Sequence, residues 1–306
     1  MKRREFLKGT IATSALVTLG GISLSSFTTK PKTKKITILH TNDTHSTIES
    51  FPADHPTYPN MGGVARRATA VSKIRQEEKN VILLDAGDIF QGTPYFNYYG
   101  GELEFKLMNK LGYDAATLGN HDFDNGLEGL LAQLPNAEFD FVNSNYDFSK
   151  TILNNYIKPY KIIEKDGVKV GIIGVGIELA GLVDTKHYKE TIYNDPVEVV
   201  NTLAKKLREE LNCDLVICLS HLGFEYKAFP NKICDLLLAE KTEGVDAIIG
   251  GHTHTFLDKP VIKTNKAGKQ VLVNQTGAYG INLGKIDFYL DQENKKISQD
   301  GVSIRV

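Results

Sequence analysis

Short apolar runs alternate with amphipathic segments along most of this chain. Five apolar runs have the length and composition of strands: residues 34–43, 81–88, 113–122, 213–223 and 245–254. Four segments carry apolar residues at helical spacing: residues 62–79, 102–112, 126–134 and 196–211. In the first of these, Val64, Ala68, Val71 and Ile74 share one predicted face. Strands that alternate with helices in this way predict a layered α/β domain.

Turn signals complete the pattern. Asp166 and Gly167 separate two apolar runs within residues 160–176, which predicts a β-hairpin. From Pro260 onward only strand patterns remain, with KAGK and DQENKK as turns. The sequence contains no internal repeat, low-complexity segment or linker between residues 33 and 306. We therefore expect one domain over residues 31–306.

The first thirty residues have a different character. Lys2, Arg3 and Arg4 precede a weakly apolar stretch that is diluted by Gly, Thr and Ser. Twin arginines followed by Phe-Leu-Lys resemble a twin-arginine export signal. The alternative is a short membrane anchor, but the stretch is poor in Leu, Ile and Phe for a stable span. We expect residues 1–30 to be an export signal and linker, and the mature protein to be periplasmic or otherwise exported.

Composition and charge argue against several classes of protein. The 306 residues are 41% hydrophobic and 24% charged, and the formal net charge is −1. Such a chain is globular and has no overall field that favours a nucleic acid polymer or an anionic membrane. Cys213, Cys218 and Cys234 are odd in number and lack CxxC spacing. This argues against a disulfide framework, although one pair remains open. Cys218 is expected in the core.

Metal-binding and proton-transferring side chains gather where the predicted strands end. Five strands finish in HTNDTH, DAGD, LGNHD, LSH and GGHTH. Strand ends of an α/β sheet meet at one rim, which would bring together Asp43, His45, Asp85, Asp88, Asn120, His121, Asp122, Asp124, His221, His252 and His254. Any one fragment could be an ordinary turn, but packing does not explain all five. Carboxylates with imidazoles are ligands for Zn, Mn or Fe, which predicts a metal site.

The ordered motifs ILHTNDTH, LLDAGD, LGNHDFD, LSHLG and IIGGHTH resemble those of the calcineurin-like metallophosphoesterases. More narrowly, they resemble the N-terminal catalytic domain of bacterial periplasmic 5′-nucleotidases and 2′,3′-cyclic phosphodiesterases, over nearly all of residues 34–306. The resemblance implies a four-layer α/β/β/α sandwich of two mixed β-sheets, the metallo-dependent phosphatase fold. It also implies a metal-dependent phosphoric ester hydrolase that acts on nucleotides.

The same resemblance assigns roles to residues. Two divalent metal ions (Mn, Zn, Fe or Co) would be held by Asp43, His45, Asp88, Asn120, His221, His252 and His254. Asp88 would bridge the ions, and a hydroxide between them would attack phosphorus directly. His121 would be catalytic and, with Asn120, would contact the substrate, while Asp124 orients His121. Asp85 is expected to be structural, and Asp122 has no assigned role.

Several alternatives stay open at this stage. The chain could be a broad phosphodiesterase or phosphomonoesterase, a thiosulfohydrolase-like relative acting on a sulfur carrier protein, or a non-catalytic metal-binding module. A separately encoded C-terminal nucleotidase domain is a possible partner, because the resemblance stops where that domain would begin. The aromatic stretch at residues 90–100 is either a rim loop near the substrate or a loop packed over the sheet edge, and we favour packing.

Overall fold

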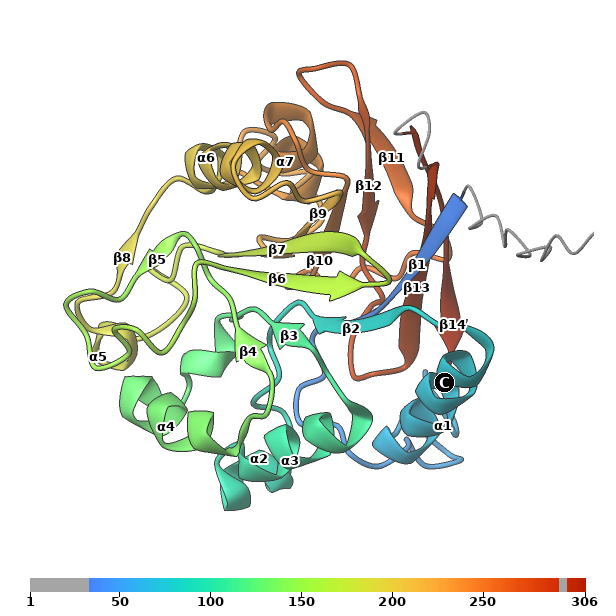
Figure 1. Ribbon diagram of the computed structural model, residues 1–306. Coiled ribbons are helices and arrows are strands. Elements are labelled where there is room, and N and C mark those ends of the chain that lie inside the picture. Colours follow the sequence, from blue (N-terminus) through green and yellow to red (C-terminus); the bar gives the residue numbers. More distant parts are fainter. Residues whose placement is uncertain (1–32, 292–295) are drawn as a thin grey trace, which may run out of the picture. The chain divides into compact units, whose positions relative to one another are not determined.

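Two six-stranded sheets dominate the part of the chain that the structure describes, residues 33–291 and 296–306. The structure is a computed structural model (Figure 1). The predicted export signal falls within residues 1–32, and the middle of the predicted turn at DQENKK falls on residues 292–295, all outside the described residues. Residues 33–306 form one unit by their own contacts.

Both sheets are mixed. The first has the strand order β14-β13-β1-β2-β3-β4: Lys296–Arg305, Asn282–Asp291, Thr33–Thr41, Val81–Asp85, Ala115–Ala116 and Asp140–Phe141. The second has the order β11-β12-β10-β9-β7-β6: Val261–Thr264, Gln270–Asn274, Ala247–Gly250, Leu215–His221, Val168–Gly176 and Tyr160–Lys165. Central strands run parallel, whereas β13, β14, β6 and β11 pair antiparallel. A short ribbon pairs β5 (Tyr146–Asp147) with β8 (Ile192–Tyr193).

Three apolar layers hold the sheets and helices together. Ile38 and Ile82 of the first sheet meet Ile217 and Ile249 of the second in the central layer, since alternate residues of a strand face opposite sides. The other face of the first sheet is covered by α1 (Val64–Glu77), α3 (Glu102–Leu111) and α4 (Gly126–Gln133). The other face of the second sheet is covered by α6 (Pro196–Glu209) and α7 (Asp235–Lys241), as Figure 1 shows. The predicted α/β/β/α sandwich is confirmed.

Local sequence explains where several elements begin and end. The α3 helix stops at Gly112, whose φ of 72° suits glycine at a helix C-terminus. The α6 helix starts with Pro196, and the Asp195 carboxylate caps it by accepting two backbone N–H groups. The β6–β7 hairpin turns at Asp166 and Gly167, both with positive φ, as predicted.

Three helices are too short for a helical spacing of apolar residues to show in the sequence, which did not predict them: α2 (Pro94–Tyr99), α5 (Thr185–Tyr188) and α7. The α2 helix occupies the aromatic stretch at residues 90–100. Its Phe96 is buried and stacks on Phe90, whereas Tyr98 is 82% exposed. The aromatic residues of the stretch therefore pack over the sheet, as favoured, and part of the stretch is helical, whereas Gln91 and Gly92 before that helix line the cavity at the strand ends. In α1, Ala68 is partly buried and packs against the same apolar layer as Val64 and Val71, as predicted, and Arg67 is buried as well.

The three cysteines are free and buried, so no pair of them forms a disulfide. Cys218 lies in the layer between the second sheet and its helices, as expected. No helix in the described residues has the length and apolar character needed to cross a membrane.

Candidate active site

Five strand ends from both sheets converge on one cavity of about 320 Å³. Asp43 follows β1, Asp88 follows β2 and Asn120 follows β3, all in the first sheet. From the second sheet, His221 ends β9 and His252 follows β10. The cavity is lined by His45, Asp88, Gln91, Gly92, Asn120, His121, His252, His254 and Tyr279. Residues more than two hundred positions apart in the sequence therefore meet at the predicted rim.

Asp43, His45 and His254 form the first of two groups that could hold a metal ion. Nε2 of His45 lies 3.0 Å from Nε2 of His254, and Nε2 of His254 lies 3.4 Å from Oδ1 of Asp43. Nδ1 of His45 lies 3.2 Å from the carbonyl oxygen of Phe90, which suits a proton on Nδ1. The lone pair of Nε2 is then free to bind a cation together with the other two side chains.

Asp88, His221 and His252 form the second group. Oδ2 of Asp88 lies 3.0 Å from Nε2 of His221 and 3.9 Å from Nε2 of His45 in the first group. The Asp88 carboxylate is therefore placed between the two groups. Nδ1 of His252 lies 2.8 Å from Oδ1 of Asn120, so the Asn120 amide lies beside the second ligand group.

The electrostatics of these buried groups suit bound cations. Burial lowers the pKa of His45, and burial lowers the pKa of His252 to about 4, so both imidazoles are neutral. Neutral imidazole is the form that binds metals. Burial opposes the charge on Asp88, but His221 outweighs it and lowers the pKa of this carboxyl. Burial opposes the charge on His221, but Asp88 outweighs it and raises the pKa of His221 to about 10, so a cation would have to displace the proton of this imidazole. The donor set of carboxylates and imidazoles fits two divalent ions.

The backbone at the site is held in an unusual conformation. Five predicted ligands have a positive φ: Asp43, His45, Asp88, His252 and His254. Such strain in residues other than glycine persists only where surrounding bonds enforce it. Here the N–H groups of Asp43 and His45 donate to the carbonyls of Gly87 and Asp88, at 2.9 and 3.1 Å. The loops after β1 and β2 thereby fix each other.

His121 lines the same cavity and is paired with Asp124, and neither residue belongs to a metal group. Nδ1 of His121 lies 3.0 Å from Oδ2 of Asp124, and this hydrogen bond raises the pKa of His121. The His121 side chain is 36% exposed, so substrate can reach it. Its backbone N–H donates to Oδ1 of Asp88 at 2.8 Å, which ties the pair to the metal groups.

Asp122, which the sequence left unassigned, is buried between the loops after β2 and β3. Oδ1 accepts N–H groups from Ile89 and Phe90 at 3.0 and 3.2 Å. Oδ2 accepts those of Asp88 and Gly119 at 3.0 and 2.8 Å. Four hydrogen bonds from two loops make this carboxylate the clamp that positions Asp88. The sequence around Asp122 does not indicate that this side chain binds backbone N–H groups more than thirty positions away.

Asp122→Asn is expected to lower metal affinity about 10- to 100-fold, the usual cost of losing a group that orients a ligand. Either orientation of the new amide turns its NH₂ toward two backbone N–H donors, which then lose their acceptor. Metal titration and thermal unfolding of the apoprotein would measure the effect. Asp124→Asn, two positions along, is the control and should keep wild-type metal affinity. Equal affinity in both variants would contradict the clamp.

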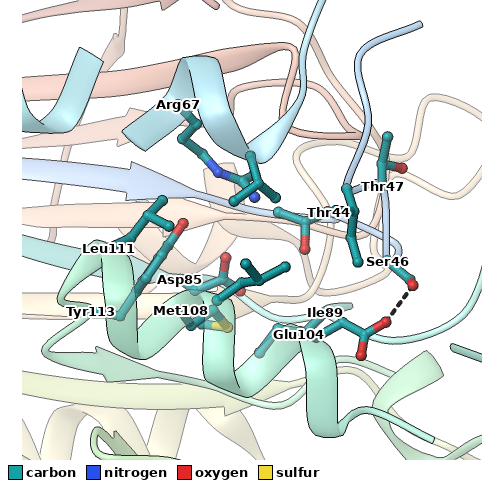
Figure 2. Close-up of a pocket in the computed structure, with 13 residues that line it drawn as sticks. Thr44, Ser46, Thr47, Arg67, Asp85, Ile89, Glu104, Met108, Leu111 and Tyr113 are labelled. Atoms are coloured by element: carbon teal, nitrogen blue, oxygen red, sulfur yellow. Dashed lines mark hydrogen bonds between the residues drawn. The ribbon is translucent and has the colours of Figure 1, made fainter. Parts of the chain in front are cut away.

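A second, smaller cavity of about 20 Å³ lies on the other side of the β1 and β2 loops. Figure 2 shows Arg67 entering from α1 and Glu104 from α3, with Ser46 donating to the Glu104 carboxylate. Asp85 faces this cavity, where it accepts the Thr41 hydroxyl, and burial raises its pKa to about 7. Asp85 lies apart from both metal groups, in keeping with the structural role expected of it.

Known proteins resemble this chain in sequence and fold. A snake venom 5′-nucleotidase from Naja atra is 40% identical over 288 residues, 87% of this chain and 52% of that protein. The crystal structure of a 5′-nucleotidase precursor from Thermus thermophilus gives a TM-score of 0.81 at 32% identity, covering 89% of this chain and 55% of that one. The crystal structure of calcineurin-like phosphoesterase YfkN from Bacillus subtilis gives a TM-score of 0.72 at 29% identity, and the match covers 89% of this chain and 91% of that one. This chain spans about half the length of the two nucleotidases.

Two metal-ligand groups on the rim of an α/β/β/α sandwich define a metal-dependent hydrolase of the metallo-dependent phosphatase fold. Within that class, the chain belongs to the calcineurin-like phosphoesterase family, whose sequence model matches residues 36–256. The match confirms the resemblance seen in the five motifs and the prediction of an enzyme.

Proposed function

We propose that this chain hydrolyses phosphate esters of nucleotides in the manner of a 5′-nucleotidase, with two bound divalent metal ions. The observation that carries the proposal is the position of Asp88 between two ligand groups, beside the His121–Asp124 pair. The nucleotide substrate is supported by relatives such as the Naja atra 5′-nucleotidase. The seven metal ligands and the roles of Asn120, His121 and Asp124 belong to this proposal.

The residues of this site have separate roles in the proposed reaction. Two ions in these groups would polarise a phosphoryl oxygen and lower the pKa of a bound water toward neutrality. With Nδ1 bonded to Asp124, His121 presents Nε2 to the substrate. From there it stabilises charge on the phosphoryl oxygens or donates a proton to the leaving oxygen. Asp124 holds the imidazole charged and correctly turned, and Asn120 completes the contact with the phosphoryl group.

A substrate panel tests this function. The purified chain would be loaded with Mn or Zn and given 5′-AMP, UDP-glucose, 2′,3′-cyclic AMP, bis-p-nitrophenyl phosphate and p-nitrophenyl phosphate. Preferred release of phosphate from 5′-AMP would support the proposal. Equal cleavage of all five esters would favour a broad phosphodiesterase or phosphomonoesterase. No cleavage of any ester, with both ions bound, would overturn the proposal, and sulfate release from a thiosulfonated carrier would then be assayed.

Export is part of the proposal. The Arg3–Arg4 pair and the weakly apolar stretch after it support a twin-arginine-type signal over residues 1–30, ahead of a catalytic domain at residues 31–306. A separately encoded nucleotidase domain is the partner that we propose from the family resemblance. Cell fractionation and co-purification from the host would test both points.

A further inference from the structure

One side of the cavity carries an aromatic ring that the sequence did not single out. Tyr279 lies in the loop between β12 and β13 and lines the cavity with the metal-ligand groups. Its ring centroid is 5.9 Å from that of His45 and 5.6 Å from that of His254. The aromatic side chains of α2, which were considered as substrate contacts, do not line this cavity. Tyr279 is the tyrosine that lines it.

Tyr279 is held in place as firmly as the metal ligands are. Its φ is 62°, the same left-handed region that five predicted ligands occupy. Its backbone N–H donates to the carbonyl oxygen of Asp43 at 2.7 Å. A bulky residue in this conformation is strained, and strain of this kind concentrates at functional sites. The ring position is therefore tied to the first metal-ligand group.

Two further aromatic side chains, Tyr58 and Phe256, continue from Tyr279. Its centroid is 6.5 Å from that of Tyr58, and Tyr58 stacks on Phe256 at 5.9 Å with an angle of 29° between the rings. Tyr58 and Tyr279 are half-buried, and Phe256 is 39% exposed. We call Tyr58, Phe256 and Tyr279 the aromatic patch. It leads from the metal-ligand groups to the surface.

The size of the cavity indicates what the aromatic patch contacts. A volume of about 320 Å³ lies at the lower end of the range for small-molecule sites. A phosphoryl group and a sugar fit within such a volume, and a ring attached to that sugar can then contact the cavity wall, to which Tyr279 belongs. Planar rings stack well on exposed aromatic side chains, and this stacking tolerates different bases.

We propose that the aromatic patch is the subsite for a planar ring on the leaving alcohol, so that the preferred substrates are phosphate esters whose alcohol carries a heteroaromatic base. The proposal rests on the phosphoesterase function proposed above and gives that function a base-binding surface within this chain. Tyr279 makes the first contact, and Phe256 extends it.

A matched pair of substrates tests the subsite. 5′-AMP and methyl ribofuranoside 5-phosphate share the phosphate and the sugar and differ in the adenine ring. The wild-type chain is expected to favour 5′-AMP about tenfold or more in kcat/KM, the value of one stacked base. Tyr279→Leu keeps an apolar side chain but removes the ring, and it should bring the ratio close to one. Tyr279→Phe keeps the ring and should preserve the ratio.

The ratio separates base binding from chemistry, because damage to the metal groups lowers both rates together. Phe256→Leu, at an exposed position, should lower the ratio in part and provides a second test if Tyr279→Leu does not fold. An unchanged ratio in the folded variants, or a wild-type ratio near one, would overturn the subsite while the phosphoesterase function stands. Failure of the wild-type chain to cleave either ester would overturn both.

Discussion

Asp88→Asn is expected to leave the chain with fewer than two bound metal ions and to lower kcat/KM about 1,000-fold or more. The Asp88 carboxylate reaches His221 in one ligand group and His45 in the other. An amide of the same size offers one neutral oxygen in place of two anionic ones, so it cannot bridge two cations as well. Metal ions supply several kcal/mol of transition-state stabilisation, and each 1.36 kcal/mol is a factor of ten in rate.

The same substitution at Asp85 provides the control. Both carboxylates are 1% exposed and close to the end of β2, but Asp85 faces the small cavity behind the loops. Asp85→Asn should therefore destabilise the fold without reducing the metal content of the folded protein. Metal analysis of both purified variants, with circular dichroism to verify folding, would make the comparison. Two ions per chain in Asp88→Asn would show that Asp88 does not bridge them.

Much of the fold follows from the sequence because its strands are buried and its long helices are amphipathic. Runs such as VILLD and LVICLSH lie in β2 and β9, which are buried along their whole length. The helices α1 and α6 have fourteen residues each, long enough for a helical period to show. The α5 helix has four residues and no period to detect. Pairing of strands within each sheet depends on contacts distant in sequence, and here the family resemblance supplied the architecture.

The candidate site was predictable to the extent that its side chains cluster in short motifs. His121 and Asp124 lie three residues apart, and the structure brings them within hydrogen-bond distance. Asp122 lies between them, but its partners are backbone N–H groups that leave no mark in the sequence. Tyr279 was missed because a tyrosine beside glycine and alanine resembles an ordinary turn. Its contact with His45 exists only after β12 returns to the rim.

His121→Ala is expected to lower kcat about 100- to 10,000-fold, the range for loss of a general acid or base, with both metal ions still bound. The His121 side chain belongs to neither ligand group, and the substitution removes its hydrogen bond to Asp124 and its edge contact with the His45 ring. The backbone N–H that donates to Asp88 remains in the alanine variant. Metal content should therefore stay close to wild type while turnover falls.

The pair can be tested as a unit through a double-mutant cycle. If Asp124 acts through His121, then Asp124→Asn lowers kcat on its own but adds little to His121→Ala, because residues that share one interaction are not additive. His187→Ala on α5, which lines neither cavity, is the matched control and should keep wild-type turnover. Additive losses in the double variant would mean that Asp124 acts independently, and normal turnover in His121→Ala would remove the histidine from the mechanism. A non-additive loss with unchanged metal content would place the pair at the reacting ester bond.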